Sequence, residues 1–238
     1  LAAGAAGGGD DGAAGAAGMS EGIEGIEGLR AVVWDFDGVL NRAGRPDAGG
    51  VYPWQHRVAQ ELGIDAAAMA QAVFGRDKAA LFTGQDDVLD RLAGWAAAAG
   101  VDLDPEEVLE IWFTADHNPD PELERILDLL AEAGVVQVIL TNNEARRARW
   151  IAQDAGWGER VDALFASGET GLMKPAPEAF AAVEKALAMA PQELLLIDDT
   201  PRNVEAAEQR GWRGWDYTPG GARALVAALM PLLLRAEG

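Results

Sequence analysis

Four short polar clusters lie where apolar runs of this chain come to an end. They are Asp35-Phe36-Asp37-Gly38, Thr141-Asn142-Asn143, Lys174-Pro175 and Asp198-Asp199. Each cluster alone is explained by a turn, a helix N-cap or a surface lysine. Together they predict one site, because parallel strands bring their carboxyl ends to the same edge of a sheet.

The residue types in these clusters are those that phosphoryl transfer needs. Two or three carboxylates can hold one Mg²⁺, which prefers oxygen ligands and keeps waters for a substrate. One carboxylate can act as a covalent nucleophile, and a second one, two residues further on, can donate and later accept a proton. A lysine and a hydroxyl can stabilise the charge on the transferring oxygens. Lys174 and Mg²⁺ would together make three close carboxylates tolerable.

The elements around these clusters predict an α/β fold. Short apolar strands are expected at 30–34, 135–140, 163–166 and 194–197, and amphipathic helices at 121–133, 145–155, 177–188 and 204–210. Strands that alternate with helices in this way indicate a Rossmann-like parallel sheet with helices on both faces.

Two segments depart from this alternation. Residues 43–119 have mostly helical patterns and are rich in Ala, Leu and Trp, which predicts a small helical cap domain between core segments 29–42 and 120–238. Residues 1–28 consist almost entirely of Gly, Ala and acidic residues. This composition predicts a disordered tail, since it cannot repay the entropy lost on ordering.

The order of the four motifs resembles that of the haloacid dehalogenase-like hydrolases. The matching segments are WDFDGVL, ILTNN, GLMKPAPEAF and LLIDDTPRN, and the resemblance extends from about Leu29 to Tyr217. The last motif, with Asn203, is similar to the branch that contains sugar-phosphate phosphatases and the phosphatase domain of soluble epoxide hydrolases. The resemblance implies a Rossmann-like core, a small helical cap after the first strand and a magnesium-dependent phosphatase activity.

The resemblance also implies roles for individual residues. Asp35 corresponds to the nucleophile and a metal ligand. Asp37 corresponds to the general acid and base, and its backbone carbonyl would also bind Mg²⁺. Asp199 corresponds to the other protein ligand of the metal, and Thr141 and Lys174 to the pair that binds the phosphoryl group.

Further residues of the motifs would support these groups. Asn142 and the backbone N–H of Gly38 are expected near the phosphate, as substrate-binding groups. Asp198 is expected to orient Lys174, and Asn203 to support the waters on the metal.

Several residues outside these roles are interpreted as structural. Arg42 stands where many phosphatases of the family have an acidic residue, a change that concerns the cap linker. Arg146 and Arg147 are interpreted as a solvated helix face. Packing or surface positions are favoured over substrate or metal contacts for five residues of the cap: Trp54, Trp95, Trp112, His56 and His117.

The favoured activity is hydrolysis of a small phosphate monoester, such as a sugar phosphate, through an aspartyl-phosphate intermediate. A phosphomutase would use the same groups and remains open. A 2-haloacid dehalogenase is disfavoured, because family members with that activity lack the acid at the position of Asp37. A non-catalytic phospho-aspartate module is disfavoured, because the DxD motif closes the first strand and all five reactive groups are present.

Composition limits the partners. The chain has 39 acidic and 19 basic residues among 238, a formal charge of −20, which repels nucleic acid and anionic membranes. The absence of cysteine excludes disulfides, thiolate catalysis and Cys-based zinc sites. A cytoplasmic monomer or homodimer that acts on a small phosphorylated metabolite, with neither nucleic acid nor membrane as a partner, is therefore expected.

Overall fold

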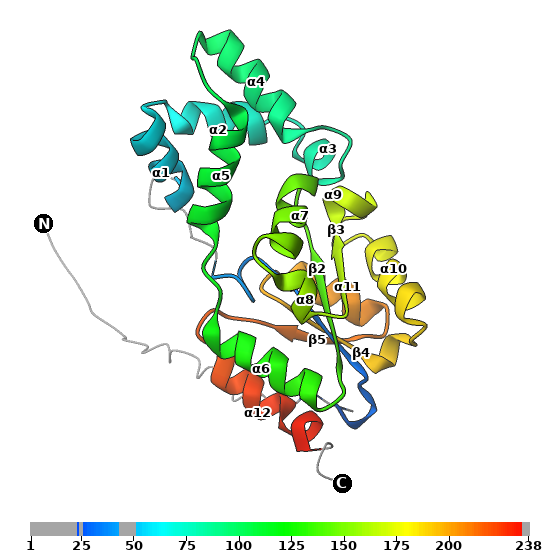
Figure 1. Cartoon of the computed structure of the whole chain (residues 1–238). Helices are drawn as coiled ribbons and strands as arrows, with labels where there is room; N and C mark the ends of the chain where they lie inside the picture. Colours follow the sequence, from blue (N-terminus) through cyan, green and yellow to red (C-terminus); the bar gives the residue numbers. More distant parts are fainter. Residues whose placement is uncertain (1–22, 24–25, 43–50, 235–238) are drawn as a thin grey trace, which may run out of the picture.

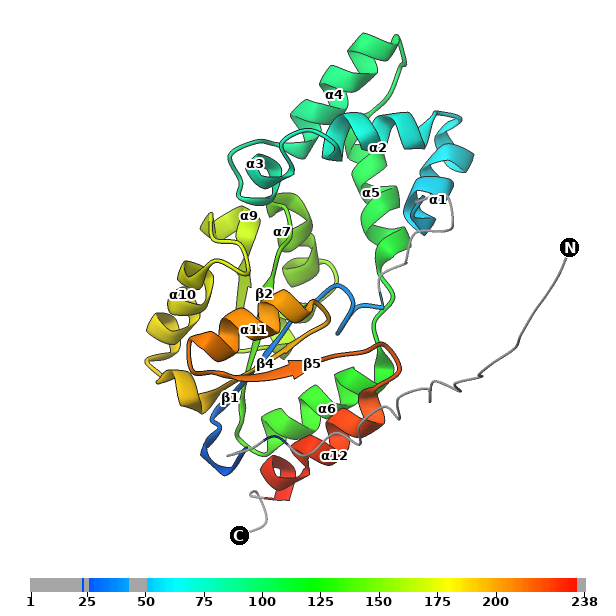
Figure 2. The same cartoon turned by 180° about the vertical axis from the view of Figure 1, so that it is seen from behind.

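The computed structural model describes residue 23 and residues 26–42 and 51–234 of the chain. These residues form an α/β core with a helical domain inserted after the first strand, as the sequence predicts (Figures 1 and 2). Among the helices of the described residues, none combines the length and the apolar run that crossing a bilayer requires.

The core contains a parallel sheet of five strands in the order β3-β2-β1-β4-β5. The strands are β1 (Ala31–Trp34), β2 (Val136–Thr141), β3 (Ala163–Ala166), β4 (Leu194–Asp198) and β5 (Arg213–Asp216). The first four lie at the predicted positions. The sequence does not predict β5, because this edge strand has only partly buried or exposed residues and no apolar run. β1 lies between β2 and β4, so the carboxyl ends of these three strands are neighbours.

Helices cover both faces of the sheet (Figures 1 and 2). Side chains alternate along β1, as the period of a strand requires. Val32 and Trp34 pack with α6 and α12 on one face, and Ala31 and Val33 pack with α10 and α11 on the other. The core helices are η1 (Ile26–Gly28), α6 (Pro121–Glu132), α7 (Ala145–Gln153), α8 (Trp157–Arg160), α9 (Ser167–Thr170), α10 (Pro177–Leu187), η2 (Pro191–Glu193), α11 (Pro201–Gln209) and α12 (Ala222–Leu233).

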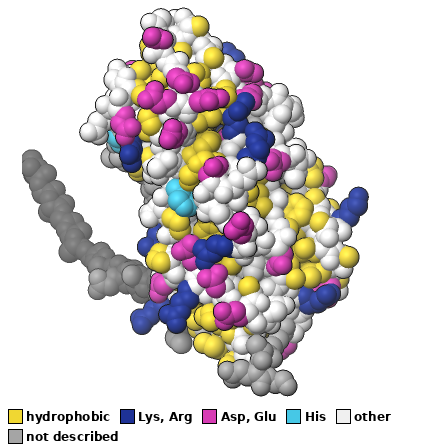
Figure 3. All heavy atoms as spheres, in the orientation of Figure 1, with side chains coloured by type: hydrophobic (Ala, Val, Ile, Leu, Met, Phe, Trp, Pro, Cys, Tyr) yellow, Lys and Arg dark blue, Asp and Glu magenta, His cyan; other side chains and the backbone are white. Residues whose placement is uncertain are grey.

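The inserted domain has a hydrophobic core of its own. Its apolar side chains, among them Trp54, Met69 and Trp112, form a cluster separate from the two that flank the sheet, and Trp95 packs against it. On the face drawn in Figure 3, many acidic side chains are spread over this domain. Its helices are α1 (Pro53–Leu62), α2 (Ala66–Phe74), α3 (Lys78–Phe82), α4 (Val88–Ala99) and α5 (Pro105–Asp116).

Hydrogen bonds join the two chain segments that connect cap and core. Asn41 is fully buried; its side chain donates to the carbonyl oxygen of Asp116 (2.9 Å) and accepts from the amide of Asn118 (2.6 Å). Arg42 forms an ion pair with Asp120, the N-cap of α6 (2.7 Å). The segment that leaves β1 and the segment that returns to α6 are thus held side by side.

The described part of the N-terminal stretch differs from the expected disordered tail. Ile26–Gly28 form η1, and Ile26, which is 4% exposed, packs in the core cluster that contains residues of α12. The expectation is therefore corrected for these residues. Residues 1–22 and 24–25 of the expected tail, and residues 43–50 at the start of the expected cap, lie outside the described residues.

Candidate active site

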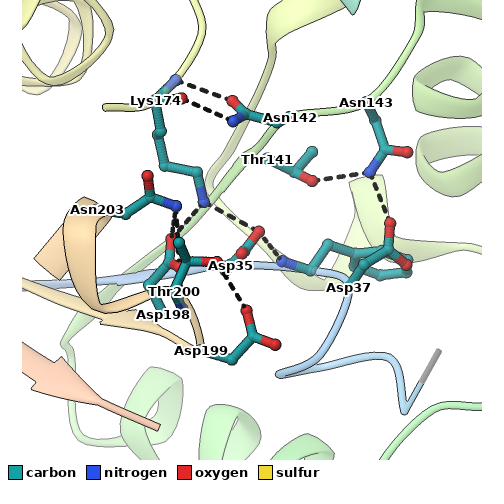
Figure 4. Close-up of polar contacts among 11 residues, drawn as sticks. Asp35, Asp37, Thr141, Asn142, Asn143, Lys174, Asp198, Asp199, Thr200 and Asn203 are labelled. Atoms are coloured by element: carbon teal, nitrogen blue, oxygen red, sulfur yellow. Dashed lines mark hydrogen bonds and ion pairs between the residues drawn. The ribbon is translucent and has the colours of Figure 1, made fainter. Parts of the chain in front are cut away.

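Asp35 lies directly after β1 and is held by both backbone and side-chain contacts (Figure 4). Its amide donates to the carbonyl oxygen of Ile197 on β4 (2.8 Å). Oδ1 of its carboxylate accepts from the amide of Phe36 (2.7 Å) and lies 3.0 Å from Nζ of Lys174. Because the residue is only 7% exposed, its carboxylate has little solvent around it.

Lys174 is buried and its amine points to two carboxylates (Figure 4). Nζ lies 3.0 Å from Oδ1 of Asp35 and 2.6 Å from Oδ2 of Asp198. Asn142 fixes the loop that carries the lysine, since its side chain accepts from the Lys174 amide and donates to the Lys174 carbonyl oxygen, each at 2.9 Å. Burial alone would lower the pKa of Lys174, but the charges of Asp35 and Asp198 outweigh burial and raise it.

The Asp198 side chain, at the end of β4, is fully buried and surrounded by donors. Oδ1 accepts from the amide of Thr200 (2.9 Å) and from Nδ2 of Asn203 (3.0 Å). Oδ2 accepts from Nζ of Lys174 and, at 3.1 Å, from the same Asn203 nitrogen. Both oxygens of Asp198 are therefore used by protein donors.

Asp199 follows at the same strand end and lies against the turn after β1. Gly38 in that turn has φ +93°, and a Cβ on it would lie 2.1 Å from Oδ2 of Asp199. Only glycine therefore allows the two segments to approach this closely. The amide of Gly38 donates to the carbonyl oxygen of Asn41 (2.8 Å), so it is engaged within its own turn rather than presented to a phosphate.

Three carboxylates of this site form an acidic cluster. One oxygen from each of Asp35, Asp198 and Asp199 lies within 4.8 Å of the other two. Burial raises the pKa of Asp35 to about 8, against the opposing charge of Lys174 and with a further upward effect of Asp198. Burial and Asp198 also raise the pKa of Asp199. The negative charge is under-compensated, and a cation at this position would relieve it.

The carboxylate of Asp37 is held by three donors. Oδ1 accepts from Nδ2 of Asn41 (2.9 Å) and from Nη2 of Arg147 (2.7 Å), and Oδ2 accepts from Nδ2 of Asn143 (3.0 Å). The same Asn143 nitrogen donates to Oγ1 of Thr141 (2.8 Å). Asn143, to which the sequence assigns no role beyond its motif, thus connects the groups that follow β1 and β2 (Figure 4).

The expectation that Arg146 and Arg147 form a solvated helix face is wrong. Arg147 is 6% exposed, and its Nη2 lies 2.7 Å from Oδ1 of Asp37 and 3.0 Å from Oδ2 of Asp116. Arg146 forms an ion pair with a cap residue. The spacing contains the missed signal, because Arg147 lies four residues before the buried Ile151 and therefore on the inner face of α7.

A cavity of about 560 Å³ lies between Asp37 and the cap. Trp54 and Trp112 pack in the cap core and also line this cavity, so packing and pocket lining are combined in these two residues. A cavity of this size suits a small ligand. Its other lining residues include Tyr52, Gln55, Gln71, Phe74, Lys78, Phe82, Asp116, Asn142, Asn143 and Arg147.

The two histidines of the cap segment have different surroundings. His56 is exposed on α1. His117 packs edge-on against Trp150, with ring centroids 5.2 Å apart, and burial, with a contribution from the charge of Arg147, lowers its pKa. Neither is among the described residues that line the cavity.

Comparison with known proteins identifies the class to which this fold and site belong. Residues 29–211 match the model of the haloacid dehalogenase-like hydrolase family. The chain is therefore a member of the haloacid dehalogenase-like hydrolases.

Two curated relatives are phosphatases by name. N-acetylmuramic acid 6-phosphate phosphatase of Pseudomonas aeruginosa is 27% identical over 196 residues, which are 77% of this chain and 79% of that protein. Phosphatase MT3486 of Mycobacterium tuberculosis is 29% identical over 111 residues, or 46% of this chain. The match spans 51% of that relative, about half its length.

Solved structures share the fold. One is a haloacid dehalogenase-like enzyme of Bacteroides thetaiotaomicron in complex with magnesium and inorganic phosphate. It superposes with a TM-score of 0.62 at 16% identity, over 81% of this chain and 96% of that one.

Proposed function

We propose that this protein is a magnesium-dependent phosphatase that hydrolyses a small phosphate monoester in the cytoplasm. The observation that carries the proposal is a buried set of three residues next to Asp199: Asp35 and Asp198 at the ends of the adjacent strands β1 and β4, and Lys174 from the loop between α9 and α10. The two relatives named as phosphatases support it.

The acidic cluster fits Mg²⁺. Asp35, Asp199 and the backbone carbonyl of Asp37 would hold it, whereas the oxygens of Asp198 already accept from protein donors and would act through Lys174. Oδ1 of Asn203 is buried and has no hydrogen-bond partner among the described residues, which suits an acceptor for a metal-bound water. When bound, the metal would neutralise charge on the phosphoryl oxygens and hold the group near Asp35.

In the first step, a carboxylate oxygen of Asp35 attacks phosphorus while the ester P–O bond breaks. Asp37 donates its proton to the departing oxygen, so the product leaves as an alcohol and an aspartyl phosphate remains. Lys174 and Thr141 would bind the oxygens of the transferring group. Asn143 would fix the positions of Thr141 and Asp37 relative to each other through its two hydrogen bonds.

In the second step, water attacks the phosphorus of the aspartyl phosphate. Asp37 takes a proton from this water, the bond between phosphorus and the Asp35 oxygen breaks, and inorganic phosphate leaves. Asp35 returns as a carboxylate and Asp37 in its protonated form, so the enzyme is ready for another ester.

Sugar phosphates belong among the first substrates to test. The cavity joins the aromatic side chains of Trp54 and Trp112 with the amides of Gln55 and Gln71, a combination that suits a compact polar ring. The Pseudomonas relative is named for an amino-sugar phosphate.

A screen of phosphate esters, scored by phosphate released in Mg²⁺ and in excess chelator, tests the proposal. No acceptor other than water is added, because a phosphomutase would use the same groups but would pass the phosphoryl group to another molecule. Mg²⁺-dependent release from at least one ester is expected. Release that continues undiminished in chelator, or no release from any ester class, would contradict the proposal.

A further inference from the structure

Two consecutive arginines at the start of α7 connect the core to the cap. Arg146 forms a two-pronged ion pair with Asp87, the N-cap of α4, with Nε and Nη2 at 2.8–3.2 Å from its carboxylate oxygens. The Arg146 side chain is 35% exposed, whereas that of Arg147 is 8% exposed. The pair thus offers one cap contact in partial solvent and one that is buried.

Arg147 contacts a catalytic candidate and the cap at the same time. Its Nη2 lies 2.7 Å from Oδ1 of Asp37 and 3.0 Å from Oδ2 of Asp116. Its guanidinium also lies over the ring of Trp112, 5.7 Å from the centroid. Asp116 and Trp112 are four residues apart on α5, so both cap contacts come from one face of that helix.

The contacts of Asp37 tie its position to the cap. Of the groups that donate to its carboxylate, Arg147 also contacts Asp116, and Asn41 also donates to the Asp116 carbonyl oxygen (2.9 Å). Movement of the end of α5 would therefore move two of the groups that hold Asp37.

The charges make Arg147 the decisive member of this set. It is the cation that lies between the carboxylates of Asp37 and Asp116, and the Asp116 side chain is 7% exposed. Without the guanidinium, the Asp37 carboxyl group would lose one of its three donors and the buried Asp116 carboxylate would lose its cation, so the position of Asp37 would no longer be fixed. A displacement of about 1 Å at a reacting group can cost about 100-fold in rate.

We propose that Arg147 is a positioning residue that holds the Asp37 carboxyl group toward the leaving group and couples its position to the cap through Asp116. The inference rests on the proposed function, in which Asp37 protonates the departing alcohol. It assigns no contact between Arg147 and the phosphoryl group.

Arg147→Gln and Arg146→Gln form a matched pair that tests this role. Both remove an arginine of α7 that contacts the cap, but only Arg147 contacts Asp37. The readout is kcat/KM, in Mg²⁺, for an alkyl phosphate and for a nitrophenyl phosphate, whose phenol leaves without a proton. For Arg147→Gln, kcat/KM for the alkyl ester should fall about 10–100-fold, and for the aryl ester by less than about threefold.

The alkyl-to-aryl ratio separates positioning from general damage to the cap. Arg146→Gln should change both esters by the same factor and keep the wild-type ratio. Arg147→Lys, which restores a cation, should recover part of the ratio. A wild-type ratio in folded Arg147→Gln would overturn the inference.

A second variant covers the case in which Arg147→Gln does not fold. Arg147→Gln combined with Asp116→Asn removes the cation and its buried cap partner together, which avoids an unpaired buried charge. The ratio should stay low in this protein, and a wild-type ratio would overturn the inference. If the wild-type enzyme itself releases no phosphate from either ester, the proposed function fails first; if it does and the ratio is constant in all variants, only the role of Arg147 fails.

Discussion

At the scale of single residues, the site is dominated by one lysine shared between two carboxylates. Lys174 contacts both Asp35 and Asp198, so it offsets the charge of only one of them, while Asp199 adds a third carboxylate nearby. Burial then raises the pKa of Asp35 to about 8. A bound cation would balance the remaining negative charge of this arrangement.

The raised pKa of Asp35 predicts that the metal-free protein loses folding stability as the pH rises. Because the pKa of Asp35 rises from 3.8 to about 8 on folding, its contribution to stability is fully present below about pH 4 and is lost as pH rises toward 8. Asparagine does not titrate. In excess chelator, the melting temperature of Asp35→Asn should therefore gain on that of the wild type between about pH 4 and pH 8. A difference in melting temperature between the two proteins that stays constant over this range would contradict a raised pKa of Asp35 in the folded state.

Gly38→Ala tests the close approach to Asp199. The substitution should lower the free energy of unfolding by about 1–2 kcal/mol, because alanine disfavours the positive φ of this position. It should also raise the Mg²⁺ concentration needed for half-maximal activity, because the new Cβ displaces the Asp199 carboxylate. Gly63→Ala is the matched control, since Gly63 has φ +64° and no neighbouring atom within 4 Å of the added Cβ. An unchanged Mg²⁺ requirement in Gly38→Ala would argue against Asp199 as a ligand.

At the scale of elements, the predictable part was the set of strands and helices that repeat an apolar pattern. β1 and β4 are buried on both faces and read as continuous apolar runs. β5 has the sequence RGWD and no such run. The residue types of the site could likewise be predicted from the strand ends. The long-range partners of Asp37 could not, because Arg147 and Asn143 are more than a hundred residues away in the sequence and reach Asp37 only in the folded core.

Asn41→Ala tests the connection between the two cap linkers. The change removes the donor to the Asp116 carbonyl oxygen and the acceptor for the Asn118 amide, both supplied by the fully buried Asn41 side chain. The free energy of unfolding, measured by urea denaturation, should fall by about 1–3 kcal/mol. Asn118→Ala, which truncates an exposed side chain, should cost less than about 0.5 kcal/mol. Equal losses would show that Asn41 does not organise the linkers.

At the scale of the whole molecule, a core that carries the reactive groups meets a helical cap (Figure 1), and residues of both line a cavity beside Asp37. The formal charge of −20 opposes the approach of an anionic ester, so attraction must come from the site itself. Composition predicted the tail as a separate segment, but the burial of Ile26 against the core depends on a long-range contact that composition does not encode.

Two N-terminal deletions test the place of Ile26. Removal of residues 1–28 should lower the free energy of unfolding more than removal of residues 1–22, by about 2 kcal/mol, because only the longer deletion removes this buried side chain. Thermal melting of the two proteins in the same buffer measures the difference. Identical melting curves would mean that η1 contributes nothing to the core.

The central claim is that Asp35 accepts the phosphoryl group, and the most direct test is turnover by Asp35→Asn in saturating Mg²⁺. Asparagine is nearly the same size but cannot form the acyl phosphate, so phosphate release should fall below detection, and the folded state should be kept, as checked by thermal melting. In the wild type, rapid acid quenching followed by peptide mass spectrometry should find phosphate on the peptide that contains Asp35. Activity of Asp35→Asn within about tenfold of the wild type, which is far above what loss of a covalent nucleophile allows, would contradict the account.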